Sequence, residues 1–380
     1  MNRLTRKNPK CEYVIKAIAG LAALLFANTV CLHGSMVACM EPNEEAEPLP
    51  PGMLEKGFVY EQAPFPSCHA STIEETKEGL VCAWFGGKGE GEPDVGIWLS
   101  RRESQQWSLP VQVADGVQDA NLRYPCWNPV LFQIPKSPLL LFYKVGPNPR
   151  QWWGMVKSSS DNGKTWSAAS RLPNGILGPI KNKPVLLKSG VIISPSSTEM
   201  DGWKAHVEIS KDKGQSWEKI GPLNDPREFG VIQPTLLLHG GNVLQLLLRS
   251  RQGKIAECWS KDGGATWEPM RATGLPNPNS GIDAVTLQDR RFLLVYNHTN
   301  RGRSPLNVAL SEDGLQWKAA LPLETEPGEY SYPAVIQGSR GQVHITYTWK
   351  RQKIRYVVLD PEKLQLREMS VPPAVQTTME

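Results

Sequence analysis

A short phrase that recurs through the chain limits the possible folds more than any other feature. It joins a serine, an aspartate, a glycine and a tryptophan at fixed offsets, and its full copies span residues 159–166, 210–217 and 260–267. A fourth copy, residues 311–317, is one residue shorter, and a fifth, residues 100–107, has lost the aspartate. In chain order the copies start 59, 51, 50 and 51 residues apart. A period near fifty residues is typical of a radial or stacked array of small sheets.

The residues of this phrase have a mechanical explanation. Aspartate, glycine and asparagine favour a tight turn, in which the aspartate carboxylate accepts hydrogen bonds from the turn amides. The tryptophan that follows can fold back under the turn and fill the wedge between neighbouring sheets. We therefore interpret the repeated phrase as structural and expect it to carry no chemistry.

Short apolar runs bounded by turn residues fill the chain between these phrases. The second unit illustrates the plan, with runs at residues 128–132, 139–143 and 154–158 followed by the turn and a short last segment. Four β-strands per unit predict an all-β, six-bladed β-propeller of four-stranded antiparallel blades. The sixth unit has only three strands, so we expect an N-terminal strand at residues 57–61 to complete it and close the ring. A stacked solenoid is the alternative, but it would require capping repeats.

The ends of the chain differ from this pattern. A basic start, an apolar run over residues 18–30 and small residues after it predict an export segment at residues 1–40. Residues 36–39, Met-Val-Ala-Cys, suggest lipid attachment at Cys39; simple cleavage and an uncleaved anchor are the alternatives. We predict a linker at 41–56, the propeller at 57–366 and a tail at 367–380. The protein is then periplasmic or extracellular, and it meets a membrane only through this N-terminal segment.

Composition argues against several classes of function. The formal charge is +4, but five basic groups and one acidic group, Glu12, lie in residues 1–38, so the remainder is balanced and nucleic acid is not an expected partner. The histidines His69, His206 and His298 lie in different units without ligand spacing, so we expect no metal and no cofactor. The cysteines of the propeller are scattered, and buried thiols are the simplest interpretation, with pairing left open in an oxidising compartment.

Alignment of the six units on their first strands yields a column of polar residues. Its members are His69, Asn128, Lys183, Gln233, Asp283 and Tyr332. Because first strands surround the channel of a propeller, these side chains should ring one mouth of it. A hydrated channel lining is the alternative explanation.

Loops between second and third strands should open at the same mouth, opposite the repeated turns. They carry further polar residues: Asp94, Lys144, Glu199, Arg249, Arg251, Asn297, His298 and Arg303. Aromatic walls for a sugar ring could come from Trp127, Trp152 and Trp153. The separation of fixed turns from variable polar groups predicts a ligand pocket at this second mouth.

The repeated phrase is the Asp-box, and over residues 57–366 the chain resembles the sialidase (neuraminidase) superfamily of six-bladed propellers, in its bacterial BNR-repeat branch. The resemblance implies a glycan substrate whose terminal acidic sugar is held through its carboxylate by three arginines. It also implies a tyrosine nucleophile supported by a glutamate, and an aspartate as acid/base. By position, Arg249 and Arg303 resemble two of the arginines, and their planar forks suit bidentate recognition of a carboxylate. Asp94 resembles the acid/base. Tyr330 resembles the nucleophile, whereas the column selects Tyr332.

Two positions depart from the family pattern. The stretch that matches the first arginine, residues 68–71, has His69 and no arginine, and the glutamate position falls on Gln233. A neutral amide cannot activate a phenol as a base, so Glu199 or Asp283 substitutes or the mechanism differs. The ordinary pKa of histidine would suit His69 as a general acid/base.

Three hypotheses follow for the function. The first is an exported, exo-acting glycosidase with retaining hydrolysis of sialic acid as the family default. The second is a hydrolase or lyase for another acidic sugar, such as a uronic acid. The third is a non-catalytic propeller that binds glycan or protein.

Overall fold

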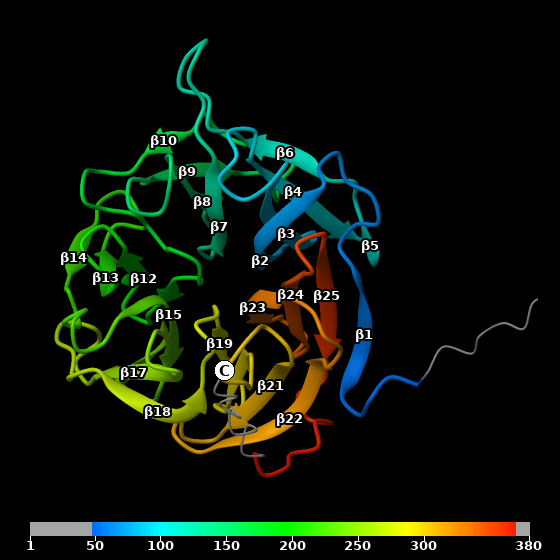
Figure 1. Ribbon diagram of the computed structural model, residues 1–380, viewed down its shortest axis with the longest axis vertical. Helices are drawn as coiled ribbons and strands as arrows, with labels where there is room; N and C mark the ends of the chain where they lie inside the picture. Colours follow the sequence, from blue (N-terminus) through cyan, green and yellow to red (C-terminus); the bar gives the residue numbers. More distant parts are fainter. Residues whose placement is uncertain (1–47, 370–380) are drawn as a thin grey trace, which may run out of the picture. The chain divides into compact units, whose positions relative to one another are not determined.

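Six β-sheets arranged around one axis make up the described part of the chain (Figure 1). The computed structural model describes residues 48–369, and within them every regular element is a strand. The predicted six-bladed all-β propeller is therefore confirmed. The proposed export segment, Cys39 and the end of the tail lie outside the described residues. Within residues 48–369 no helix is long and apolar enough to cross a membrane.

The blades follow one another along the chain, and each runs from an inner to an outer strand. The first contains β2 (Ser67–Thr76), β3 (Gly79–Gly87) and β4 (Gly96–Glu103), with the short strands β5 (Gln106–Trp107) and β6 (Val111–Ala114) both paired to β4. The second contains β7 (Cys126–Gln133), β8 (Leu139–Val145), β9 (Trp153–Ser159) and β10 (Ser170–Arg171). The third contains β11 (Val185–Leu186), β12 (Ile192–Thr198), β13 (Lys204–Ser210) and β14 (Glu218–Ile220).

The remaining blades have the same order. The fourth contains β15 (Val231–Leu238), β16 (Leu244–Ser250), β17 (Lys254–Ser260) and β18 (Arg271–Pro276). The fifth contains β19 (Asp283–Thr286), β20 (Phe292–Tyr296), β21 (Leu306–Ser311) and β22 (Trp317–Glu324). The sixth contains β23 (Tyr330–Gln337), β24 (Val343–Trp349), β25 (Lys353–Leu359) and, as its outer strand, β1 (Met53–Phe58).

Pairing of β1 with β25 closes the ring and joins the two ends of the propeller. The closing strand begins at Met53, so the predicted linker at 41–56 is wrong over its last four residues and the expected strand at 57–61 is displaced. Residues 53–56 were missed because an outer strand leaves much of its surface to solvent and therefore lacks a long apolar run. At the other end, Arg367 exchanges two backbone hydrogen bonds with Ala319 of β22, so the chain stays on the propeller beyond residue 366.

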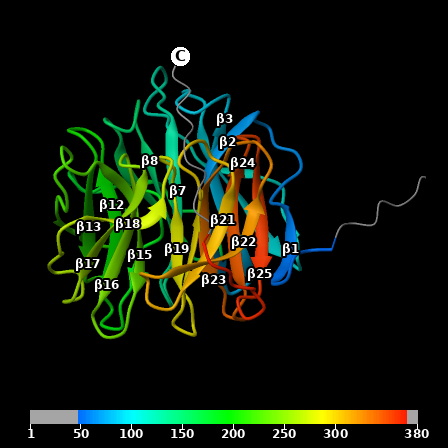
Figure 2. The same ribbon diagram turned by 60° about the horizontal axis from the view of Figure 1, so that its bottom comes forward.

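The Asp-box turns are closed networks of local hydrogen bonds. In the turn after β17, the Ser260 hydroxyl donates to Asp262 (2.8 Å) and accepts from the Gly264 amide (2.8 Å). Asp262 also accepts from the backbone N–H and the hydroxyl of Thr266, and these bonds lower the pKa of its carboxyl to about 2. The indole of Trp267 donates to the Gly264 carbonyl and packs against the core between blades. The strands run between this face and the opposite one, as the side view shows (Figure 2).

Candidate active site

Four of the six inner strands carry the same irregularity near their start. In β2, β7, β15 and β23 the antiparallel register shifts, and one residue of each bulge has a positive φ. These residues are Ala70 (55°), Asn128 (35°), Gln233 (55°) and Tyr332 (52°). A positive φ is uncommon for residues other than glycine, and bulges of this kind redirect side chains beside functional sites. The repeated bulge therefore marks the channel mouth as the place where function is to be sought.

The register corrects the polar column at three of its six positions. In the first blade the bulge residue is Ala70, and His69 precedes it. The strand pairs of β11, β15 and β19 align the third, fourth and fifth blades. In this alignment Gln233 of the fourth blade corresponds to Lys181 in the third and to Gly281 in the fifth. Lys183 and Asp283 lie two residues further along. The alignment failed there because β11 and β19 start later than the other inner strands and lack the bulge.

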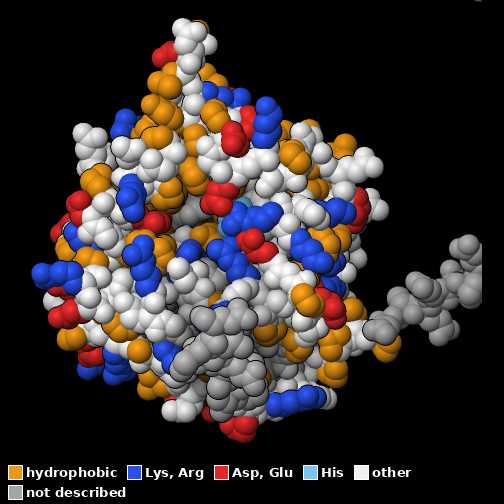
Figure 3. All heavy atoms as spheres, in the orientation of Figure 1, with side chains coloured by type: hydrophobic (Ala, Val, Ile, Leu, Met, Phe, Trp, Pro, Cys, Tyr) orange, Lys and Arg blue, Asp and Glu red, His pale blue; other side chains and the backbone are white. Residues whose placement is uncertain are grey.

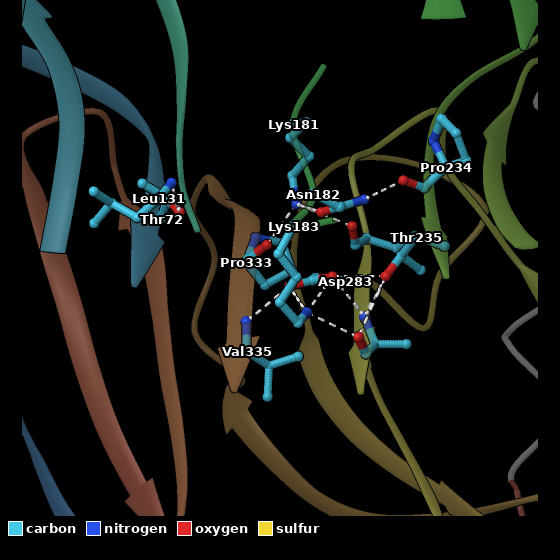
Figure 4. A network of polar contacts seen from close by, with 12 residues as sticks. Thr72, Leu131, Lys181, Asn182, Lys183, Pro234, Thr235, Asp283, Pro333 and Val335 are labelled. Atoms are coloured by element: carbon cyan, nitrogen blue, oxygen red, sulfur yellow. Dashed lines mark hydrogen bonds and ion pairs between the residues drawn. The ribbon is translucent and has the colours of Figure 1, made fainter. Parts of the chain in front are cut away.

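Lys183 and Asp283 form a closed network inside the channel (Figure 4). The Lys183 amine lies 3.1 and 2.9 Å from the two oxygens of Asp283. The same carboxylate, 1% exposed, accepts from the Thr235 hydroxyl (2.7 Å) and from the Val335 amide (2.8 Å). Because these groups belong to blades three to six and saturate one another, they tie the inner strands together. This geometry argues against Lys183 as a ligand for substrate and against Asp283 as a substitute base.

Lys181, which was not predicted from the sequence, lies in the channel one layer of side chains nearer the mouth than Lys183. Its amine donates to Asn182 (2.7 Å) and to the carbonyls of Ile282 (2.9 Å) and Pro333 (Figure 4). It lies 5.8 Å from the centroid of the Tyr332 ring. Burial lowers the pKa of Lys181 to about 7, although the nearby Asp283 opposes the shift. Lys181 thus joins three blades directly beside the tyrosine.

Tyr332 lies at the centre of a hydrogen-bonded group contributed by blades four and six. Arg249 donates through Nη1 to the Tyr332 hydroxyl (2.9 Å) and to Gln233 Oε1 (3.2 Å). Gln233 Nε2 donates to the same hydroxyl at 3.0 Å. Arg249 Nε donates to Asn279 (2.8 Å), so two of its three nitrogens bind protein. The structure therefore brings together three residues that the sequence had placed at the site.

Tyr330 is separated from this group. Its side chain is 1% exposed and packs in the hydrophobic cluster between blades five and six, with Leu306, Val308 and Tyr347. A strand places residues i and i+2 on the same side, so Tyr330 and Tyr332 could not be distinguished from spacing. The bulge in β23 turns Tyr332 toward the channel and leaves Tyr330 in the core.

A third arginine, Arg351, joins Arg303 around one carboxylate. Arg303 Nη1 and Arg351 Nε each donate to Glu329 Oε1 at 2.6 Å. The Arg351 carbonyl accepts from the Cys68 amide (2.9 Å), so the residue adjoins the inner strand of the first blade, where the resemblance leads one to expect an arginine. Arg351 was not predicted because the turn from β24 to β25 places Lys350 and Arg351 at positive φ, whereas such a turn is recognisable in a sequence when glycine, asparagine or aspartate occupies it.

His69 is enclosed by these cations. Its ring centroid lies 4.0 Å from that of Tyr332, and its Nδ1 hydrogen-bonds the Thr348 hydroxyl (2.9 Å). Burial lowers the pKa of His69 well below its ordinary value, and the charges of Arg351 and Arg303 act in the same direction. The imidazole is therefore neutral at neutral pH. Its Nε2 is buried and has no hydrogen-bond partner among residues 48–369.

The loop between β3 and β4 brings two carboxylates to this face. Asp94 accepts from the Lys88 amide through Oδ2 (3.1 Å), while its buried Oδ1 has no hydrogen-bond partner in the described chain. Glu90 accepts from Arg351 Nη1 (2.6 Å), which ties the loop to the arginine group. An unsatisfied carboxylate oxygen in a tethered loop is suited to proton exchange with a ligand.

Glu199 and Asn128 complete the residues expected at this mouth. Glu199 accepts from the indole of Trp203 (3.0 Å), and Arg249 lies over the Trp203 ring, 5.1 Å from its centroid. Burial raises the pKa of Glu199, against the opposing charge of Arg249. Asn128 is buried in the bulge of β7, next to Trp127. Neither Glu199 nor Asp283 hydrogen-bonds Tyr332 within residues 48–369, so neither replaces the expected glutamate in this geometry.

The surface of this face reflects the buried arrangement. Lysine and arginine side chains gather around the hollow at its centre, with acidic side chains beside them (Figure 3).

The four cysteines of the propeller, Cys68, Cys82, Cys126 and Cys258, are buried free thiols. Within residues 48–369 no three His, Cys, Asp or Glu side chains are grouped as metal ligands.

Comparisons with known proteins agree with the fold. The family model of the BNR repeat-like domain matches residues 78–345. A sialidase of Bacteroides fragilis (strain YCH46) is 22% identical over an alignment of 236 residues that covers 53% of this chain and 42% of that protein. The chain thus matches less than half the length of this relative.

Among solved structures, a Dyadobacter fermentans protein of unknown function superposes with a TM-score of 0.68 at 18% identity, covering 83% of this chain and 99% of that one. The Hadza microbial sialidase Hz136 gives 0.68 at 17% identity, covering 79% and 66%. The intramolecular trans-sialidase of Ruminococcus gnavus gives 0.66 at 13% identity, covering 82% and 98%. At these identities the likeness shows a shared fold.

Proposed function

The chain belongs to the sialidase superfamily of BNR-repeat β-propellers, and we propose that it is a glycoside hydrolase that removes a terminal acidic sugar from a glycan. The family default for that sugar is sialic acid. A uronic acid is the second candidate, because the arginines of the site bind a carboxylate and do not by themselves distinguish one acidic sugar from another.

The observation that supports this proposal is the convergence of three guanidinium groups around Tyr332 and His69. Arg303 uses Nη1 for Glu329 and Ser331, so its Nε and Nη2 have no partner among residues 48–369. Arg249 and Arg351 each use Nε and Nη1, which leaves Nη2 of both without a partner in the same range. A ligand carboxylate would therefore meet one complete fork, from Arg303, and one terminal NH2 group from each of the other two arginines. The expected bidentate contact from Arg249 is replaced by an end-on contact.

The carboxylates of the site have separate roles in this proposal. Glu329 holds Arg303 and Arg351 at a fixed spacing, and these two cations keep the pKa of Glu329 below its ordinary value despite its burial. Asp94 supplies the proton that the leaving oxygen needs when the glycosidic bond breaks. Tyr332 faces the reacting end of the sugar.

We also propose that the protein is exported, to the periplasm or the outside of the cell, with lipid attachment at Cys39 as one form of anchoring. The basic and apolar character of residues 1–40 supports this. Cell fractionation of the wild type and of Cys39→Ala is the test. Release of the variant alone into the soluble exported fraction supports a lipid anchor, and cytoplasmic recovery of both contradicts export.

A screen of glycans tests the activity. The purified protein is incubated with sialosides and with uronic-acid-capped oligosaccharides, and the released monosaccharide is identified by mass. The expected result is release of an acidic sugar, with the rate strongly reduced in Asp94→Asn and Arg303→Ala. Release of neutral sugars alone would contradict the carboxylate site.

Gln233 favours one alternative, a propeller that binds acidic glycans without cleaving them. An amide in place of a carboxylate removes the base that the family uses to activate its tyrosine. This alternative predicts saturable binding of the same sugars that is lost in Arg303→Ala, with no released product for the wild type on any glycan of the screen.

A further inference from the structure

The orientation of the Gln233 amide is fixed by Arg249. A guanidinium group has only donors, so the atom of Gln233 that faces Arg249 Nη1 at 3.2 Å must be the carbonyl oxygen Oε1. The opposite orientation would place two N–H groups against each other. Nε2 therefore faces Tyr332, and the bond of 3.0 Å between them is donated by the amide.

This orientation determines what the Tyr332 hydroxyl can do. Its oxygen accepts from Gln233 Nε2 at 3.0 Å and from Arg249 Nη1 at 2.9 Å. With two donors directed at the oxygen, neither Gln233 nor Arg249 can receive the phenolic hydrogen. In residues 48–369 no other group accepts it, so the hydrogen is available to a ligand in the pocket.

We propose that Tyr332 donates a hydrogen bond to an oxygen of the bound sugar and forms no covalent bond to it. A phenol that attacks carbon must lose its proton to a base, and Gln233 occupies the place of that base with an N–H donor. This inference rests on the proposed function and determines its stereochemistry.

Hydrolysis then proceeds by a single displacement. The anomeric C–O bond breaks, its electron pair passes to the leaving oxygen, and that oxygen takes the proton of Asp94. A water molecule forms the new bond to the anomeric carbon and releases a proton to solvent. Because one displacement inverts the configuration, the first product is the inverted anomer, in contrast to the retaining default of the family.

The anomer released first is the decisive observation. Proton NMR during the first minutes of turnover distinguishes the two anomers before they equilibrate. Intact-mass analysis after incubation with a fluorinated glycosyl fluoride of the active sugar detects any covalent adduct. The inverted anomer without an adduct is expected for the wild type. A retained anomer, or an adduct mapped to Tyr332, would overturn the inference and would leave the proposed hydrolase intact.

Two variants sharpen this test. Gln233→Glu supplies an acceptor for the phenolic hydrogen, and it should give a Tyr332 adduct and a retained product; inverted product without an adduct from this variant would contradict the assigned role of the amide. In His69→Gln the first product should still be the inverted anomer, whatever the change in rate, because His69 takes no proton from Tyr332. A change of anomer in His69→Gln would overturn the inference.

Binding provides a readout that does not depend on turnover. Tyr332→Phe removes the donor and should weaken binding of the acidic sugar about tenfold, the usual effect of one hydrogen bond in a pocket. Tyr330→Phe, two residues away on the same strand but in the core, is the matched control and should bind as the wild type does. Equal affinity of Tyr332→Phe and wild type would overturn the inference, whereas failure of the wild type to bind any acidic sugar would refute the proposed function itself.

Discussion

The two faces of the propeller satisfy their polar groups in different ways. On the Asp-box face the partners of each aspartate lie within a few residues of it; Asp212, for example, bonds only Ser210, Gln215 and Ser216 within residues 48–369. On the arginine face, the channel mouth that carries Arg249, Arg303 and Arg351, the partners come from other blades, as for Tyr332 with Arg249 and for Arg351 with Glu90. Several groups there, including His69 Nε2 and Asp94 Oδ1, have no partner in the described chain. Local hydrogen bonds of the serine and aspartate build the turns that set the fold, although the indole nitrogens of Trp107 and Trp166 in two of the repeated phrases also lack a partner among residues 48–369. On the arginine face the groups without a partner lie at the channel mouth, where a ligand can reach them.

The largest expected effect is a loss of folding stability, without a loss of activity, when an Asp-box tryptophan is removed. Trp317 is 8% exposed, donates to the Gly314 carbonyl and packs against Phe292 and Leu294. Trp317→Ala should lower the free energy of unfolding by about 3–5 kcal/mol, because it opens a cavity between blades. Urea denaturation gives this value, and kcat/KM per folded molecule should not change.

Leu315 of the same turn, 49% exposed, is the control for that substitution. Leu315→Ala should change the stability by less than about 0.5 kcal/mol, as is usual for surface positions. A fully folded Trp317→Ala protein with reduced kcat/KM would show that this face contributes to function and would break the comparison.

On the arginine face a substitution is expected to lower the activity and not the folding stability. Arg303→Ala should lower kcat/KM on the acidic glycan about 100-fold, equivalent to about 2.7 kcal/mol, because the complete fork for the carboxylate is lost. Arg227→Ala, on an exposed loop and paired only with Asp225 within the described residues, should leave kcat/KM unchanged. Steady-state kinetics of both variants decides the point, and equal losses would contradict a specific carboxylate site.

A buried lysine near the arginine face predicts a pH effect on stability. Burial lowers the pKa of Lys144 to about 7, and its amine donates to the Pro179 carbonyl. Between pH 7 and its ordinary pKa near 10.4 the unfolded chain binds a proton that the folded chain lacks, so this group raises stability as the pH rises. The stability of the wild type relative to Lys144→Met should therefore increase over this window, by at most about 1.4 kcal/mol per pH unit. Lys211→Met, at a solvent-exposed lysine, should show no such trend in denaturation at several pH values.

The smallest effect concerns the Asp-box aspartates in acid. Hydrogen bonds from Thr266 and Ser260 lower the pKa of Asp262 to about 2, and bonds from Ser216 and Ser210 do the same for Asp212. A depressed carboxyl pKa stabilises the fold above the ordinary value near 4, and this contribution disappears as the pH falls toward 2. Asp262→Asn should therefore lose less stability than the wild type between pH 4 and pH 2. Identical acid denaturation curves for the two proteins would contradict this account of the turn.

The sequence predicted the parts of the molecule that depend on local bonds. The Asp-box period determines the blade count, because each turn closes on itself and leaves the same residues at the same offsets. Arg249, Arg303 and Gln233 could be placed at one mouth for the same reason, since the period sets the register of the strands that carry them.

What escaped prediction depends on tertiary backbone geometry. The bulges that separate Tyr332 from Tyr330, and His69 from the true column, change the side of the strand on which a residue lies without a sequence signal. Arg351 reaches the site through a turn with two residues at positive φ, neither of them glycine or asparagine. Lys181 was overlooked in favour of Lys183 because only the register reveals which one shares a layer with Gln233.

The claim that the arginine face recognises a carboxylate is tested most directly by removing the charge from the substrate. The measurement is kcat/KM of the wild type on the active acidic glycoside and on the methyl ester of the same glycoside. A value about 100-fold lower is expected for the ester, with a much smaller difference between the two substrates in Arg303→Ala, where only the Nη2 groups of Arg249 and Arg351 still face the carboxylate. Equal values for acid and ester in the wild type would contradict it.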